Sequence, residues 1–94
     1  PRKIKLPESA VKKEPFAVRK YHIDTNEHVN NCQYVQMAME YIEHTGDIRQ
    51  VRVEYKNSAV YGDIIVPKVA AEETRTVVEL CDESDRIFAT VEFS

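Results

Sequence analysis

The feature that most constrains the fold of this chain is a helical segment with little polar surface. Between residues 29 and 43 the polar side chains recur at steps of three and four. On a helix they would form one narrow stripe, made of Gln33, Gln36, Glu40 and Glu43. The other positions are largely apolar, and we expect burial of the row formed by Val29, Cys32, Val35, Met39 and Ile42. Other elements must therefore cover most of this helix.

After the helix the apolar period changes to two. Gly46 suits a left-handed C-cap, and His44 would place a cation at the negative end of the helix dipole. Alternation and turn residues predict strands at 16–22, 51–56, 64–71, 74–81 and 86–93. Because short connections favour antiparallel neighbours, we predict an α+β fold. In it, a curved antiparallel sheet of about five strands wraps one long central helix.

The chain is long enough for one small domain with one hydrophobic core. Residues 1–14 carry many charges and Pro7, and Pro15 follows them directly, so we expect a connector from an upstream half. Residues 15–94 are expected to form the domain itself. Since the chain begins with Pro1 rather than Met, we interpret it as a fragment or a processed piece.

Composition and charge exclude several classes of protein. With 43% hydrophobic and 31% charged residues the chain resembles a globular domain, and no apolar run is long enough to span a bilayer. A net charge of −3 argues against nucleic acid as the main partner. The two cysteines are too few for a disulfide scaffold and lie in apolar stretches, which favours a cytoplasmic location.

Positive charge is concentrated near the amino terminus. Seven of the thirteen Lys and Arg residues lie among the first twenty residues, whereas residues 21–48 contain none. This surface, which includes Lys12 and Lys13, could bind an acidic protein or a phosphorylated cofactor arm. The alternative is a solvated charged segment without a partner.

Polar residues gather directly before the predicted helix. Asp24, Asn26 and His28 supply a carboxylate, an amide and an imidazole. The N–H groups and the partial positive charge of a helix amino terminus suit a developing oxyanion. These three residues are therefore candidates for catalysis. The structural alternative is that Asp24 or Asn26 caps the helix and that His28 packs beneath it.

The order of these residues resembles that of a known family. The signature of hot dog thioesterases is similar to the stretch Asp24-Thr25-Asn26-Glu27-His28-Val29-Asn30-Asn31, followed by Tyr34 and Glu40. The Asn two residues before the His resembles the fatty acyl-acyl-carrier-protein (acyl-ACP) thioesterases of plants and bacteria. The likeness extends over residues 2–66.

The resemblance implies a hot dog fold and hydrolysis of fatty acyl-ACP to free fatty acid and ACP in fatty acid biosynthesis, without a cofactor. Members of this family carry two hot dog halves in one chain, and this sequence is similar to the second, catalytic half. The implied partners are ACP with its acyl-phosphopantetheine arm and another hot dog half, in cis or as a homodimer.

Residue by residue, the resemblance implies that Asp24, Asn26 and His28 are catalytic. Asp24 could attack the thioester carbonyl or activate a water, with Asn26 and His28 orienting it and stabilising charge. The implied oxyanion donors are the backbone N–H groups of Val29 and Asn30.

One departure from the family lies after the next strand. The plant enzymes carry a Glu-Cys pair there, whereas this sequence has Ser58 and Ala59. This excludes a cysteine nucleophile at that position and makes Ser58 a possible wall of the site. Two alternatives therefore stay open: a non-catalytic structural or acyl-binding module, and a single-domain acyl-CoA thioesterase.

Other assignments of the reactive side chains are weaker. Cys32 follows His28 by four residues and could form a His–Cys pair with it, but its apolar row favours the core. Cys81 ends a strand and is also expected in the core. A metal site built from His22, Asp24 and His28 lacks a fourth ligand, so no metal is expected.

Overall fold

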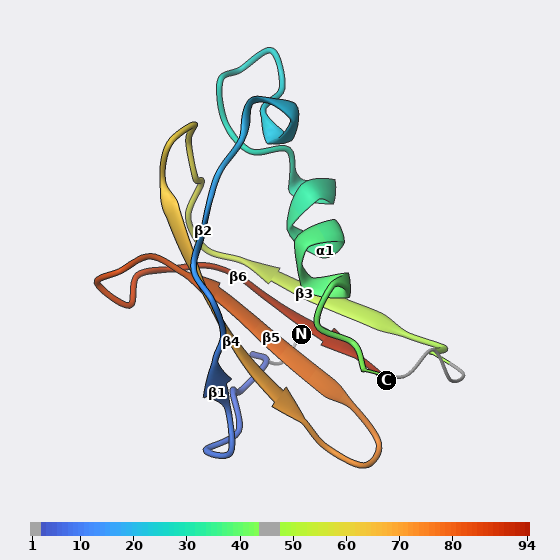
Figure 1. Cartoon of the computed structure of the whole chain (residues 1–94). Helices are drawn as coiled ribbons and strands as arrows, with labels where there is room; N and C mark the ends of the chain where they lie inside the picture. The colour runs from blue at the N-terminus through green and yellow to red at the C-terminus, as the bar shows by residue number, and fades with distance from the viewer. Residues whose placement is uncertain (1–2, 44–47) are drawn as a thin grey trace.

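The computed structural model describes residues 3–43 and 48–94. Their elements are β1 (Val11–Lys12), β2 (Phe16–Ala17), the 3-10 turn η1 (Lys20–His22), α1 (Asn31–Met39), β3 (Val51–Tyr55), β4 (Ile64–Ala71), β5 (Thr76–Cys81) and β6 (Ile87–Phe93). All pairs are antiparallel, in the order β1-β4-β5-β6-β3, and β2 also pairs with β4. Figure 1 shows α1 against one face of this sheet. The α+β prediction is confirmed.

The number of strands differs from the prediction. Among the described residues the sheet has six strands instead of about five, because β1 lies within residues 1–14 and pairs with β4. The first predicted strand, 16–22, is reduced to Phe16–Ala17. Its end folds into η1 because the N–H of His22 donates to the carbonyl of Arg19 over 3.0 Å. The strand predicted at 64–71 coincides with β4.

The helix is shorter than predicted, at Asn31–Met39 instead of 29–43. It begins at Asn31 because Asn30 is the N-cap, whose Oδ1 accepts the N–H of Cys32 over 2.9 Å. Beyond Met39 the N–H groups of residues 40–42 donate to carbonyls three residues earlier, which tightens the chain into turns. The predicted cap at Gly46 and the role of His44 lie outside the described residues. No described helix is long and apolar enough to cross a membrane.

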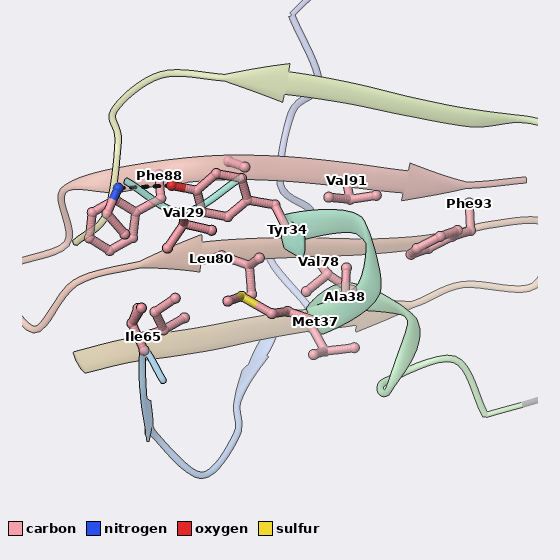
Figure 2. Close-up of a cluster of buried hydrophobic side chains, with 14 residues drawn as sticks. Val29, Tyr34, Met37, Ala38, Ile65, Val78, Leu80, Phe88, Val91 and Phe93 are labelled. Atoms are coloured by element: carbon pink, nitrogen blue, oxygen red, sulfur yellow. Dashed lines mark hydrogen bonds between the residues drawn. The ribbon is translucent and has the colours of Figure 1, made fainter. Parts of the chain in front are cut away.

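The face of α1 that packs on the sheet is formed by Tyr34, Met37 and Ala38, which are all buried. They contact the cluster that includes Val78 of β5 and Val91 of β6, as Figure 2 shows. A single sheet covers only one stripe of a helix. The prediction of a buried apolar row was therefore wrong for two of its five residues, Cys32, which is exposed, and Met39, which is 48% exposed.

The opposite face of the sheet carries a network of charges. Glu92 of β6 is buried and accepts hydrogen bonds from Arg52 of β3 (3.1 Å) and from Arg75 before β5 (2.6 Å). On the same face Lys68 bonds to Asp85 (2.8 Å) and lies 3.8 Å from Glu79. The segment before β1 crosses this face in both views, and its Ile4 is buried (Figures 1 and 2). The sheet is thus covered on both sides, although by a helix on one side only.

Candidate active site

The loop between η1 and α1 is a small closed hairpin. An isolated bridge joins Ile23 to Val29, and the N–H of Asp24 donates to the carbonyl of His28 over 3.1 Å. A second bridge joins His28 to Val60 in the segment that follows β3. In Figure 1 this loop projects beyond the amino-terminal end of α1. Its backbone is therefore held at both sides, by its own ends and by residues 59–60.

The three predicted catalytic residues lie in this hairpin. Asp24 is half-buried, and its Oδ1 accepts the N–H of Asn26 over 2.8 Å. Asn26 and His28 are exposed. Glu27, between them, has a φ of 63°, a left-handed conformation that turns the chain back toward α1. The hairpin thus places the three side chains on one short loop, with the carboxylate of Asp24 fixed through one oxygen.

The structural alternative for these residues was wrong. Neither Asp24 nor Asn26 caps α1, because Asn30 does so. His28 is exposed and does not pack beneath the helix. Asp24 holds its own loop through an Asx turn, which leaves its second oxygen without a hydrogen-bond partner among the described residues.

Both N–H groups predicted as oxyanion donors already donate hydrogen bonds within the chain. The N–H of Val29 donates to the carbonyl of Ala59 over 2.9 Å, and that of Asn30 donates to the carbonyl of His22 over 3.1 Å. These two hydrogen bonds hold the hairpin against the segments that contain His22 and Ala59. The described residues show no acceptor for the N–H of Asn31, the first residue of α1.

The segment that carries Ser58 and Ala59 supports the loop. Ala59 is fully buried, and its N–H donates to the hydroxyl of Tyr34 over 2.8 Å, the dashed line of Figure 2. Burial is the main reason why the pKa of Tyr34 is raised, so the hydroxyl stays neutral. Ser58 is exposed beside this anchor. The segment supplies backbone contacts to the hairpin, with neither a carboxylate nor a thiol at these two positions.

A groove of about 920 Å³ runs along the exposed side of α1. Its walls include Phe16, Arg19 and His22 from the amino-terminal side and Cys32, Gln36 and Met37 from α1. Asp24, Asn26 and His28 do not line it, so the structure separates the predicted catalytic loop from the groove beside it. Cys32, for which the core was expected, lies on the groove wall.

His22 also lines this groove, although the sequence suggested it only as a ligand of the rejected metal site. It is only 7% exposed, and its Nδ1 accepts the N–H of Arg19 over 2.9 Å. Burial and the nearby Arg19 guanidinium lower its pKa, so the imidazole is neutral at neutral pH. The only signal in the sequence was its position two residues before Asp24.

The described residues include no group of three or more His, Cys, Asp or Glu side chains that could hold a metal ion. Both cysteines are free thiols. Cys81 is buried and its Sγ donates to the carbonyl of Val66 over 3.3 Å, so its predicted place in the core is confirmed.

Comparison with known proteins identifies relatives of this arrangement. The family model described as the acyl-ACP thioesterase C-terminal domain matches residues 5–92. The acyl-ACP thioesterase of Bacteroides thetaiotaomicron VPI-5482 superposes with a TM-score of 0.87 at 19% identity, over 99% of this chain and 40% of that one. A putative oleoyl thioesterase from Lactobacillus plantarum gives 0.70 at 24% identity, over 99% and 40%.

A third solved structure is that of SAV2348 from Staphylococcus aureus in complex with CoA. It superposes with a TM-score of 0.77 at 14% identity, over 90% of this chain and 73% of that one. No curated protein sequence matches. The present chain spans about two fifths of the length of the Bacteroides thioesterase. The likeness to these three structures shows the hot dog fold.

Proposed function

Because this chain belongs to the family of acyl-ACP thioesterase C-terminal domains, we propose that it is the catalytic half of a thioesterase that hydrolyses fatty acyl-ACP to free fatty acid and ACP. The observation that carries this proposal is the Asp24 carboxylate. One of its oxygens is fixed by the N–H of Asn26, and the other has no partner among the described residues. A fixed carboxylate with one free oxygen is suited to activate a water or to attack a thioester.

The neighbours of Asp24 complete the proposed chemistry. Asn26 and His28 are exposed on the same hairpin and are available to orient the attacking group and the thioester. Since the N–H groups of Val29 and Asn30 hold the loop, we assign the oxyanion to the N–H of Asn31. At the first residue of α1, this donor also acts with the positive end of the helix dipole.

A second hot dog half is part of this proposal, in cis or as a second copy. Within the described sheet β3 has β6 on one side and no strand on the other. Two of its side chains on the α1 face are incompletely covered, Val51 at 46% exposure and Tyr55 at 44%. An open edge with exposed apolar side chains is stabilised by a further partner.

ACP is the proposed protein substrate, carrying its acyl-phosphopantetheine arm. Lys12 of β1 and Lys13 after it are exposed, as a surface for an acidic protein requires. The groove along α1 combines apolar walls with the side chains of Gln36 and Arg19, which fits an arm that alternates methylene and amide groups.

The second candidate is a non-catalytic acyl-binding half. It is favoured by the segment after β3, where Ser58 is exposed and Ala59 is a buried anchor. In that case the groove binds an acyl arm, and the bond is cut elsewhere or not at all.

Substitution of Asp24 by Asn separates these candidates. An amide oxygen still accepts the N–H of Asn26, so the loop persists while the base or nucleophile is lost. We expect the kcat of the full-length protein on acyl-ACP substrates to fall by about 100-fold or more. The matched control is Asp82→Asn, since Asp82 makes the same kind of turn with Ser84 at 2.8 Å in the β5–β6 connection.

The control should leave turnover unchanged. Near-normal turnover of Asp24→Asn would overturn the role of Asp24. A wild-type protein that hydrolyses no acyl-ACP of any chain length would favour the acyl-binding half.

A further inference from the structure

The imidazole of His22 has one nitrogen that accepts a hydrogen bond and one that has no partner among the described residues. Nδ1 accepts the N–H of Arg19 over 2.9 Å, so the proton of the neutral ring lies on Nε2. No side-chain nitrogen or oxygen that is fully buried in the described structure lacks a partner, and Nε2 has none. Nε2 therefore reaches the surface. Because His22 is 7% exposed and lines the groove along α1, we infer that Nε2 faces this groove.

The ring is also held firmly in place. The backbone N–H of His22 donates to the carbonyl of Arg19 at 3.0 Å, and its carbonyl accepts the N–H of the cap residue Asn30 at 3.1 Å. The ring of Tyr21 lies against it, with 4.3 Å between the ring centroids. Because both the backbone and the tautomer are fixed, little conformational entropy is lost when the Nε2–H donates to a ligand.

The other groove walls indicate the ligand that this donor meets. Phe16 and Met37 are apolar, and Gln36 offers an amide for hydrogen bonding. An extended chain with carbonyl groups between methylene segments matches this alternation. From these contacts we propose that His22 is a substrate-binding residue whose Nε2–H donates a hydrogen bond to a carbonyl oxygen of the acyl-pantetheine arm. This inference rests on the proposed thioesterase function.

Two substitutions of His22 separate binding from support of the fold. His22→Asn places an amide oxygen near the position of Nδ1 and keeps the acceptor for Arg19, but it removes the donor at Nε2. His22→Gln places an amide N–H₂ near the position of Nε2. With acyl-ACP substrates and the full-length protein, we expect Asn to raise KM by about tenfold with kcat within about twofold.

His22→Gln should recover part of the lost affinity. The melting temperature of His22→Asn should stay close to that of the wild type. If KM is unchanged in His22→Asn, His22 acts only as a support of the loop and the proposal is overturned.

A second measurement does not require turnover. In the ¹⁵N-labelled full-length protein, imidazole spectra should show His22 protonated at Nε2 and not at Nδ1. Addition of the amide analogue of acyl-pantetheine, in which N–H replaces the thioester sulfur, should shift the Nε2–H signal. A shift in a protein without thioesterase activity would support His22 while overturning the proposed function. Binding of the analogue without a shift at Nε2 would overturn the role of His22 alone.

Discussion

Two apolar stripes of α1 have different surroundings. On the sheet side Tyr34, Met37 and Ala38 are buried, and the hydroxyl of Tyr34 accepts the N–H of Ala59. On the other side Cys32 and Met39 are exposed, and Cys32 also lines the groove. An apolar stripe of a helix therefore need not be buried within its own domain. One side stabilises this fold, and the other is exposed in the described structure.

The largest expected effect compares two methionines on these two sides. Met37 is 6% exposed and Met39 is 48% exposed, only two residues apart on the same helix. Met37→Ala should lower the free energy of unfolding by about 2–5 kcal/mol, because it removes buried volume and leaves a cavity. Met39→Ala should change it by less than about 0.5 kcal/mol.

Urea unfolding of the full-length variants, followed by circular dichroism, measures both methionine changes. A cost at Met39 close to that at Met37 would contradict the exposure of Met39. It would mean that another part of the protein covers this side of α1.

A smaller effect on stability is expected when Tyr34 in α1, or Tyr41 just after it, is changed to phenylalanine. Tyr34→Phe removes the acceptor of the buried Ala59 N–H, which should cost about 1–3 kcal/mol. Tyr41 is half-buried on the groove side, and no hydrogen bond of its hydroxyl occurs in the described structure, so Tyr41→Phe should be close to neutral. Thermal melts of the two single variants test this. Equal losses would show that hydrogen bonding does not distinguish the two sides.

The smallest expected effect is a dependence of stability on pH. Burial and Arg19 lower the pKa of His22 in the folded chain, so the unfolded chain binds this proton more readily. The contribution of the neutral imidazole is therefore complete above the unfolded pKa of about 6.5, and it is lost as the pH falls through the folded pKa. Relative to His22→Asn, the wild type should lose unfolding free energy below about pH 6.5. Parallel curves from pH 5 to 8 would contradict this sign.

Much of the sheet could be predicted from the sequence, because alternation and turn residues act locally. β4 coincides with the predicted strand at 64–71, and β6 begins one residue later than predicted. β1 was missed because two residues give no periodic signal, and only their pairing with Val69 and Lys68 makes them a strand. The start of α1 was placed two residues early because the apolar Val29 continues the helical pattern but pairs with Ile23 instead.

Fewer features of the candidate site than of the sheet could be predicted from the sequence. The family signature predicted Asp24, Asn26 and His28 as catalytic residues, and the structure places all three on one hairpin. The pattern could not show that the N–H groups of Val29 and Asn30 hold this hairpin in place. It also could not show which of two apolar stripes of α1 faces the sheet. The orientation of the His22 ring depends on the hydrogen bond that its Nδ1 accepts from the backbone N–H of Arg19. The periodicity of apolar residues contains no information about this bond.

The left-handed backbone of Glu27 has a consequence for laboratory evolution of this domain. At most loop positions glycine loosens the chain, but at a φ of 63° glycine and asparagine fit with less strain than glutamate. In a library randomised at position 27, these two residues should be enriched after selection for heat resistance, and valine and isoleucine should be depleted. Because Glu27 separates Asn26 from His28, this position offers a way to tune the rigidity of the hairpin while every proposed catalytic side chain is kept.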